Sequence, residues 1–417
     1  MVRIIDFVTF YNYYVYHQTA SIITFQITDE CNCACKYCYE SNKGHSHMSQ
    51  ETAKKAVDLL FTMWDENNPE ALINQNSKQI LFEFIGGEPL LDYKLIDYIC
   101  SYFLETCIKK DHYWMDHWKG LFISNGLLYF DPGVQEFLKK WKNFIHPAIS
   151  LDGPKEVHDI NRITKSNQPT FDKSYAAYKD LKEHYKDYYL PQWITKAVIN
   201  KNNISKVYDT FLFFVDDGIR RINMQFDLEE KWDLEDAQIL YPQLKKCADM
   251  MIQNPKLDFS LLGKLLLPRQ MTMDTPCGCN FRRKLAFSWD GSITPCLRFY
   301  GTSLEEPYIV GNVDSGINYK HPIFETMYPT TMYSPECQQC PINANCFTCI
   351  AASYKTTGQM VKDRYICDIY KVSAIVSYYL YNSCHRKNYK KMPLDDDEII
   401  RLISQEEFNE LREQKLI

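Results

Sequence analysis

The sequence predicts an α/β fold in which a parallel sheet, closed fully or in part into a barrel, precedes a smaller cysteine-rich region. Strand-like and helix-like segments alternate between residues 21 and 226, as expected for repeated βαβ units. The unusual short motifs all follow strand-like segments, and functional sites gather at the C-terminal ends of strands in such folds. Beyond residue 230 the alternation stops and Cys residues become frequent.

The composition sets limits on the class of protein. The chain has 417 residues, 45% hydrophobic and 24% charged, which argues against extensive disorder. This length predicts about two or three domains. The formal net charge of −6 gives no sign of the basic face of a nucleic-acid binder. No apolar run is long enough to span a membrane, and the N-terminal residues lack the features of a signal peptide. We therefore expect a cytoplasmic protein that binds neither nucleic acid nor membranes.

Six segments rich in β-branched and aromatic residues are predicted as strands. They lie at 21–28, 79–85, 121–124, 147–151, 194–199 and 221–226. A tight hairpin is also predicted at Asp290 and Gly291, between the segments LAFSW and SITPC.

Helices are predicted between these strands and after them. Ser49 is expected to cap a helix that runs to about residue 67, and Asp131 to cap a helix with Pro132 at its first position. The remaining helices are expected at 93–109, 171–184, 204–216, 234–252, 366–383 and 398–413.

Most of the 16 Cys residues fall into three groups. Disulfides are rare in the reducing cytosol, so grouped thiols there indicate metal or redox chemistry. Four Cys residues stand alone and are interpreted as small buried apolar residues. The first group is Cys31, Cys33, Cys35 and Cys38; the second is Cys277, Cys279 and Cys296; the third is Cys337, Cys340, Cys346, Cys349 and Cys367.

The first group has the spacing C-x-x-x-C-x-x-C at Cys31, Cys35 and Cys38. Three thiolates on one tight loop can hold one face of a cubic iron–sulfur cluster, leaving one iron without a protein ligand. An open coordination position is typical of catalytic metal sites. A structural zinc site with Cys33 as the fourth ligand is the alternative, although this spacing lacks the usual pair of zinc knuckles.

The segment CNCACKYCYE followed by GGEPLL resembles the radical S-adenosylmethionine (SAM) superfamily. The resemblance implies that Cys31, Cys35 and Cys38 hold a catalytic 4Fe–4S cluster whose unique iron is chelated by SAM. It also implies that SAM and the cluster are contacted by the aromatic before the last Cys and by the motifs GGEP, SNG, SLDG and HDxxR. The residues expected to bind the cofactor are Tyr37, Gly86, Gly87, Glu88, Pro89, Ser124, Asn125, Ser150, Asp152 and Arg162.

The later Cys residues resemble the C-terminal extension called SPASM, which carries two auxiliary 4Fe–4S clusters. One departure is that two residues separate Cys346 from Cys349, where the family has three. The resemblance implies eight ligands in two sets, which would make three clusters in all. One set is Cys277, Cys279, Cys296 and Cys349, and the other is Cys337, Cys340, Cys346 and Cys367. A pair of structural zinc sites is the alternative for these Cys residues.

These resemblances predict a partial (β/α)6 barrel of the TIM type followed by a small, irregular, cysteine-rich iron–sulfur domain. The expected divisions are an N-terminal segment at 1–20, the barrel at 21–230, a helical bridge at 231–274, the SPASM domain at 275–385 and a helical tail at 386–417.

The resemblance implies an oxidoreductase-type enzyme that matures a ribosomally synthesised peptide. We expect a thioether crosslink from a Cys sulfur to carbon; the alternatives are a carbon–carbon or carbon–oxygen crosslink and formylglycine formation in a sulfatase. Formylglycine-forming relatives tend to carry Asp directly after the hairpin Cys, where this chain has Leu297. A non-catalytic metal-binding protein is the rival from another class.

The same resemblance implies several partners. They are a precursor peptide and an external electron donor of the ferredoxin or flavodoxin type. Too few residues precede the first strand to form a leader-binding domain. Leader recognition would therefore use the barrel edge, the terminal segments or a separate leader-binding protein.

Overall fold

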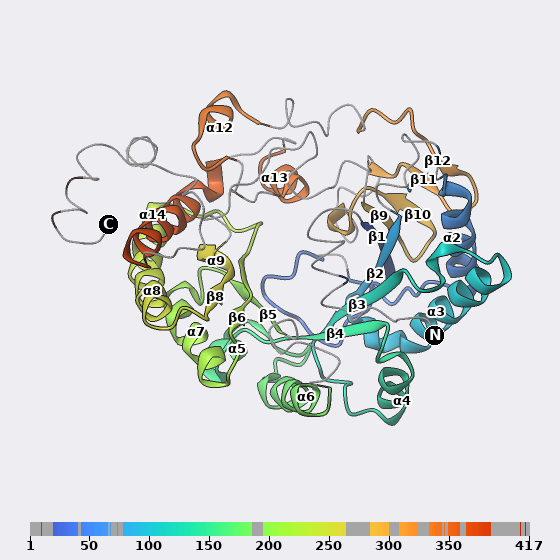
Figure 1. Ribbon diagram of the computed structural model, residues 1–417, viewed down its shortest axis with the longest axis horizontal. Helices are drawn as coiled ribbons and strands as arrows, with labels where there is room; N and C mark the ends of the chain where they lie inside the picture. Colours follow the sequence, from blue (N-terminus) through green and yellow to red (C-terminus); the bar gives the residue numbers. More distant parts are fainter. Residues whose placement is uncertain are drawn as a thin grey trace. The chain divides into compact units, whose positions relative to one another are not determined.

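The structure is a computed structural model, and its described residues form two compact units (Figure 1). The first unit comprises Met1–Leu151, Arg162–Thr195 and Gly278–Met327, and the second comprises Asp152–Asn161, Lys196–Cys277 and Tyr328–Ile417. The described residues are 10, 20–40, 43–65, 67, 73, 78–185, 195–263, 284–299, 308–323, 333–343, 346, 349–358, 364–384, 409 and 413.

The first unit alternates strands and helices and ends in short antiparallel strands. Its elements are β1 (Ala20–Thr28), α2 (Gln50–Met63), β2 (Gln79–Gly86), η2 (Pro89–Asp92), α3 (Tyr93–Lys109), η3 (Tyr113–Met115), β3 (Trp118–Ser124), α4 (Pro132–Trp141), β4 (Ile145–Ser150), α6 (Phe171–His184), β9 (Lys284–Phe287), β10 (Ser292–Thr294), η7 (Leu297–Phe299), β11 (Gly311–Asn312) and β12 (Gly316–Ile317).

The described strands of this unit form one sheet in the order β12-β11-β10-β9-β1-β2-β3-β4. The strands β9, β1, β2, β3 and β4 run parallel, whereas β10, β11 and β12 pair antiparallel with their neighbours. The helices α2, α3 and α4 connect successive parallel strands and lie together along one side of the sheet (Figure 1). This arrangement brings the C-terminal ends of β1, β2, β3 and β4 to a common edge.

Aromatic side chains fill the core of the first unit. The ring of Phe25 lies 5.5 Å from that of Phe82, 6.0 Å from that of Phe84 and 5.5 Å from that of Phe287. All four side chains are fully buried. Because successive strand residues point to opposite faces, this packing fixes the register of β1 against β2 and β9.

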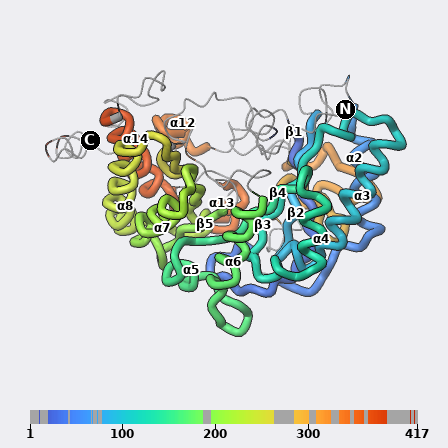
Figure 2. The backbone as a smooth tube through the Cα atoms, turned by 60° about the horizontal axis from the view of Figure 1, so that its bottom comes forward, coloured from blue at the N-terminus to red at the C-terminus, as the bar shows by residue number. Residues whose placement is uncertain are grey.

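The second unit contains the later helices and several short strands. Its elements are α5 (Lys155–Asn161), β5 (Thr195–Ile199), η5 (Ile204–Lys206), α7 (Val207–Asp216), β6 (Arg221–Ile222), β7 (Met224–Phe226), α8 (Leu234–Gln253), β8 (Asp258–Phe259), α9 (Ser260–Gly263), α12 (Pro335–Gln339), α13 (Ile350–Thr357), η9 (Arg364–Ile366) and α14 (Cys367–Cys384). Here β5 pairs in parallel with β7, and β6 pairs in parallel with β8. The helix α14 packs against α8 (Figure 2).

The predicted alternation of strands and helices is confirmed, with local differences. The helix α2 ends at Met63, β3 begins three residues earlier than expected, and a 3₁₀ turn forms the start of the helix expected at 204–216. The strand expected at 221–226 is two strands, because the chain changes pairing partner from β8 to β5 at Asn223. The hairpin is confirmed, with Gly291 at a φ of 87° that favours glycine.

Some predictions fall outside the described residues. These are the N-terminal segment apart from residues 10 and 20, the tail from 386 apart from residues 409 and 413, and both Cys277 and Cys279. Within the described part of the chain, no helix combines the length and apolar character needed to cross a bilayer.

Candidate active site

The cysteine loop begins directly after β1. Cys31 and Cys33 are buried, whereas Cys35 and Cys38 are partly exposed. The Cys33 amide donates to the Cys31 sulfur at 3.4 Å, and the Ala34 amide donates to the Ile163 carbonyl at 2.8 Å. These bonds fix the loop at the sheet edge, with two of the three motif cysteines partly exposed.

Two glycines allow the end of β2 to approach this loop. The Gly87 amide donates to the Thr28 carbonyl at 3.1 Å, and the Glu88 amide donates to the Glu30 carbonyl at 2.9 Å. A Cβ atom on Gly86 would lie 2.6 Å from the Thr28 carbonyl oxygen, and one on Gly87 would lie 2.3 Å from that of Glu30. Any other residue at either position would therefore push the GGEP segment away from the cysteine loop.

Glu88 lies at the centre of the site. Its side chain is 1% exposed and accepts hydrogen bonds from the Ser124 hydroxyl at 2.8 Å, the Asn125 amide at 2.8 Å and the Leu90 amide at 3.1 Å. Burial raises the pKa of Glu88 to about 7, although these hydrogen bonds favour the ionised form. A carboxylate offers about four lone-pair sites, so three protein donors leave capacity for one further donor.

Asn125 connects the end of β3 to the cysteine loop. Its side-chain amide donates to Asn32 Oδ1 at 2.6 Å, and its backbone carbonyl accepts from the Ser174 hydroxyl at 2.6 Å. Asn32 lies between Cys31 and Cys33. The structure thus brings the cysteine loop, GGEP and SNG together at one edge of the sheet, as predicted.

Arg162 lies against the same loop. Its guanidinium is 5.3 Å from the centre of the Tyr37 ring, and its backbone carbonyl accepts from the Thr170 hydroxyl at 2.9 Å. Ser150 is the last residue of β4 and is largely buried. Arg162 and Tyr37 are therefore adjacent in the first unit, a pairing that their distance in the sequence does not reveal.

Asp152 belongs to the second unit, where its carboxylate contacts the backbone of β5. Its Oδ1 accepts from the Val198 amide at 3.0 Å, and its carbonyl accepts from the Thr210 hydroxyl at 3.1 Å. This geometry gives Asp152 a role in organising the second unit, and its contact with a cofactor remains a prediction.

The chemistry of the donors in the cysteine loop fits an iron–sulfur cluster. Among the described residues, no group of three or more His, Cys, Asp or Glu side chains is arranged to hold one metal ion. In a cubic cluster each thiolate binds a separate iron, so the ligands lie further apart than the ligands of one ion. Three thiols on one loop beside a buried carboxylate suit this arrangement.

The later Cys residues divide between the two units. Cys296 follows β10 in the first unit. In the second unit, burial raises the pKa of Cys367 to about 11, and the nearby Cys337 and Cys340 add to this effect. The structure thus brings together three of the four Cys residues expected to hold one auxiliary cluster. The fourth, Cys346, lies close to Tyr370, and Tyr370 belongs to α14, the helix that begins at Cys367.

Two residues of the site were not identified from the sequence. Asn32 accepts from Asn125, and the Lys43 ammonium donates to the Cys33 carbonyl at 3.4 Å. Burial opposes the charge on Lys43, but the neighbouring Cys38 and Cys31 sulfurs raise its pKa overall. Neither residue occupies a motif position, so spacing does not identify it. The one sequence signal is the positive charge of Lys43 a few residues after a loop of four thiols.

Comparisons of the sequence identify a shared domain and several relatives. Residues 22–143 match a family described as a 4Fe-4S single cluster domain. The chain is 31% identical over 205 residues to an uncharacterised protein of Methanocaldococcus jannaschii, covering 49% of this chain and 60% of that protein. It is 28% identical over 193 residues to a serine-type anaerobic sulfatase-maturating enzyme of Bacteroides thetaiotaomicron, covering 44% and 40%. It is 27% identical over 166 residues to a radical SAM cyclopropyl synthase of Paramaledivibacter caminithermalis, covering 38% and 32%. The chain thus spans from about a third to three fifths of these relatives.

Solved structures share the fold over most of the chain. A structure of anSMEcpe with bound AdoMet, which is SAM, has a TM-score of 0.67 at 19% identity and covers 88% of this chain and 99% of that one. A structure of SuiB from Streptococcus suis bound to precursor peptide SuiA has a TM-score of 0.50 at 15% identity and covers 83% and 75%. At these identities the likeness shows a common fold, and it confirms the predicted α/β fold with a cysteine-rich C-terminal region.

The motifs, the site geometry, the relatives and the fold agree with one another. The cluster-domain match covers the cysteine loop, GGEP and SNG, which the structure joins through Glu88 and Asn125. The chain therefore contains a 4Fe-4S single cluster domain, is similar in sequence to enzymes described as radical SAM and sulfatase-maturating, and shares its fold with anSMEcpe and SuiB.

Proposed function

We propose that this protein is a maturase that forms a thioether crosslink in a ribosomally synthesised peptide. The observation that carries the proposal is the position of Glu88 beside the cysteine loop. Its carboxylate accepts hydrogen bonds from the Ser124 hydroxyl and the Asn125 amide, the first two residues of the SNG motif. A buried carboxylate next to three thiols is the arrangement needed to hold SAM against a cluster.

Each site residue has a defined part in this proposal. Cys31, Cys35 and Cys38 would hold the 4Fe–4S cluster, and Glu88 would accept from the ammonium group of SAM. Arg162 and Ser150 would lie near the carboxylate and ribose of SAM. When bound, the cluster and SAM would supply a 5′-deoxyadenosyl radical that removes a hydrogen atom from an unactivated carbon. The chemistry itself would come from the cluster and SAM, and the protein would position the substrate carbon.

Two auxiliary 4Fe–4S clusters in the SPASM region complete the proposal. One would be held by Cys277, Cys279, Cys296 and Cys349, and the other by Cys337, Cys340, Cys346 and Cys367. Crosslinking removes two electrons from the peptide, and the auxiliary clusters would accept the second. A ferredoxin or flavodoxin would provide the electron that starts the reaction, and a separate leader-binding protein is one means of delivering the precursor peptide.

The fold relatives support a peptide or protein substrate. The structure of SuiB contains its precursor peptide, and another structure of anSMEcpe contains AdoMet together with a peptide. The choice of crosslinking over formylglycine formation depends on the residues after Cys296. Leu297 carries no acid, and the Arg298 guanidinium stacks 4.5 Å from the centre of the Tyr39 ring. No carboxylate therefore occupies the position where formylglycine-forming relatives tend to carry a base.

Anaerobic sulfatase maturation is the second candidate function. It is favoured by the sulfatase-maturating relatives, one of which, a cysteine-type enzyme of Clostridium perfringens, is 24% identical over 292 residues and aligns over 71% of its own length. In that case the substrate would be a folded sulfatase or its nascent chain, and the acid–base group would have to come from a residue other than the one after Cys296.

Mass spectrometry of a coexpressed substrate separates these functions. The short reading frames and any sulfatase encoded beside this protein would each be coexpressed with it and analysed after thiol alkylation. A thioether removes two hydrogen atoms and one alkylatable thiol. A carbon–carbon or carbon–oxygen crosslink removes two hydrogen atoms and leaves every thiol alkylatable. Conversion of a sulfatase residue to an aldehyde that reacts with a hydrazine probe would reject the crosslinking proposal in favour of the second candidate.

A further inference from the structure

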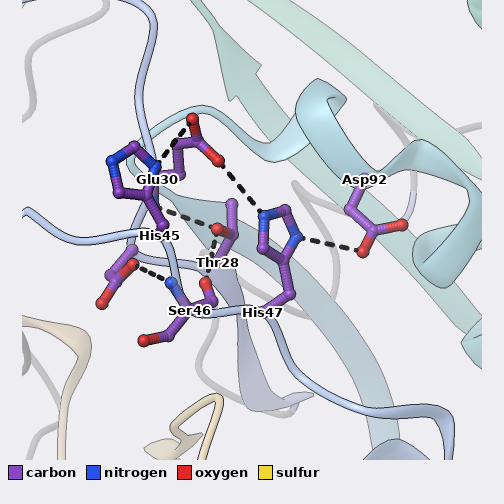
Figure 3. A network of polar contacts seen from close by, with 7 residues as sticks. Thr28, Glu30, His45, Ser46, His47 and Asp92 are labelled. Atoms are coloured by element: carbon purple, nitrogen blue, oxygen red, sulfur yellow. Dashed lines mark hydrogen bonds and ion pairs between the residues drawn. The ribbon is translucent and has the colours of Figure 1, made fainter.

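A polar network outside the SAM-facing motifs connects the cysteine loop to the turn after GGEP (Figure 3). It lies at the end of β1, where the chain returns beside the strand at residues 45–48. The Thr28 hydroxyl donates to the Ser46 carbonyl at 2.7 Å, and the Ser46 amide donates to Asp29 Oδ1 at 2.7 Å. These two bonds between side chains and the Ser46 backbone fix the positions of His45 and His47.

His47 bridges two carboxylates in this network. Its Nε2 lies 3.4 Å from Glu30 Oε2, and its Nδ1 lies 3.2 Å from Asp92 Oδ2. Figure 3 shows the ring between the two acids, with a contact at each nitrogen. The side chains are only partly exposed, at 35% for His47, 30% for Glu30 and 28% for Asp92.

The two acids belong to the two segments that build the proposed cluster and SAM site. Glu30 directly precedes Cys31, and its carbonyl accepts from the Glu88 amide. Asp92 ends the 3₁₀ helix that begins at Pro89, and its other oxygen accepts from the Leu95 amide at the start of α3. His47 therefore joins the first cluster-binding residue and the GGEP turn from outside the site.

The geometry also defines the protonation state that the bridge requires. Ionised carboxylates only accept hydrogen bonds, whereas a neutral imidazole has one donor and one acceptor. A neutral His47 could donate to one acid and would present a lone pair to the other. Both contacts are satisfied only when the ring carries a proton on each nitrogen.

The charges around His47 agree with a cationic ring. Glu30 and Asp92 face it directly, and His45, on the same segment, contacts Glu30 Oε1 at 3.1 Å. Lys165, from the loop after α5, also acts on Glu30. Two carboxylates therefore face the ring of His47 from different segments of the chain.

We propose that His47 is a positioning residue whose protonated ring clamps the cysteine loop to the GGEP turn, so that retention of the catalytic cluster weakens as the ring loses its proton. This inference rests on the proposed cluster site. Histidine is the side chain whose charge ordinarily changes between about pH 5 and pH 8, so a test of the clamp spans this range. Loss of the bridge between His47 and the two acids would loosen the segment that carries Cys31 without removing any cluster ligand.

The test measures iron release from the reconstituted holoprotein to an excess of an iron chelator, without SAM, across about pH 5.5 to 8.5. His47→Arg keeps a cation with donors for both acids at every pH, whereas His47→Gln is neutral at every pH. We expect the wild-type release rate to match His47→Arg at the acidic end and His47→Gln at the alkaline end. The two variants should differ by about three- to fivefold, the size typical of partly exposed ion pairs.

Two further variants sharpen the result. His45→Gln changes the neighbouring, 76% exposed ring that contacts one acid, and it should follow the wild-type profile. Asp92→Asn keeps an acceptor for Leu95, but its amide can donate to a neutral His47, so the dependence on His47 protonation should disappear. If His47→Arg does not fold, as judged by circular dichroism, the comparison of wild type with Asp92→Asn carries the test.

The inference would be overturned if the iron-release rates of wild type and His47→Gln changed with pH in the same way. It would also be overturned if His45→Gln altered the pH profile as His47→Gln does. A chain that takes up no iron at all would instead reject the proposed function. The two failures are therefore distinguishable.

Discussion

Four thiols lie close together in the cysteine loop, and only three have the spacing of cluster ligands. Cys33 is buried, and its amide donates to the Cys31 sulfur. Contacts with the Cys31 and Cys35 side chains raise the pKa of Cys33, and its position falls outside the C-x-x-x-C-x-x-C spacing. The residue therefore fits a supporting role within the loop better than a fourth place in the metal site.

Replacing single cysteines of the loop tests this assignment. Cys35→Ala should abolish release of 5′-deoxyadenosine from SAM under reducing conditions, because one iron of the catalytic cluster loses its ligand. Cys33→Ala is the matched control in the same loop, and it should retain the cluster absorption and most of the release. Chromatography of the nucleoside product measures both. Persistent release from Cys35→Ala would disprove the ligand assignment.

The carboxyl group of Glu88 should make SAM binding depend on pH. Burial raises the pKa of Glu88 to about 7, so the group gains its charge as the pH rises through this value. Because the ammonium of SAM, the proposed partner of Glu88, would bind the ionised form, the Kd for SAM should fall by up to about tenfold between about pH 6 and pH 8.

Glu88→Gln supplies the comparison, because its amide has no titrating proton. Its Kd for SAM, measured by equilibrium dialysis with the reconstituted protein, should be higher at the alkaline end and nearly constant with pH. A wild-type affinity that does not change over this range would contradict the role given to Glu88.

At the scale of elements, the close contact of β1 and β2 depends on the glycines that end β2. Gly87→Ala would place a Cβ atom 2.3 Å from the Glu30 carbonyl oxygen, and this backbone cannot move without displacing Cys31. We expect a loss of about 1–3 kcal/mol in the free energy of unfolding, together with a loss of iron from the catalytic site.

A substitution at a glycine distant from the site is the control that separates the loss of stability from the loss of iron. Gly218 has a φ of 82°, and a Cβ atom added to it would meet no other atom within 4 Å. Gly218→Ala should therefore cost about 1 kcal/mol through backbone strain alone. Chemical denaturation and iron analysis of both variants give the comparison. Equal iron content in the two would show that Gly87 is not needed to place the loop.

Several elements were predictable because their determinants are local. Ser49 caps α2 by accepting from the Thr52 amide, and Asp131 caps α4 with Pro132 at the first position, as their residue types indicate. The split at 221–226 was not predictable, because all of these residues favour a strand. What divides them is the change of partner at Asn223, where Ser260 binds both backbone groups of Met224.

At the scale of the whole molecule, the eleven assigned Cys residues predict the metal content. Three clusters would give about twelve irons per chain after anaerobic reconstitution. Cys367→Ala should lower this number by about four, because it removes a ligand from one auxiliary site and leaves the catalytic loop intact. Iron and sulfide analysis measures the change. A preparation containing only zinc would contradict the cluster assignment throughout.

The sequence by itself determined the parallel α/β character, the order of most strands and helices, and the identity of the motifs at strand ends. These follow from residue preferences, from local caps and from the rule that strand ends in parallel folds share one edge. It also indicated cluster chemistry, because the spacing of three thiols in one loop is a local property of the chain.

Only the tertiary structure decided which of these residues act on one another. The bonds from Ser124 and Asn125 to Glu88, the stacking of Arg162 on Tyr37 and the bridge made by His47 join residues far apart in the sequence. No periodicity or spacing encodes such pairs, because they depend on register between strands and on the path of the connecting loops. The raised pKa of Glu88 has the same origin, since burial by several segments, and not the residue type, sets its charge.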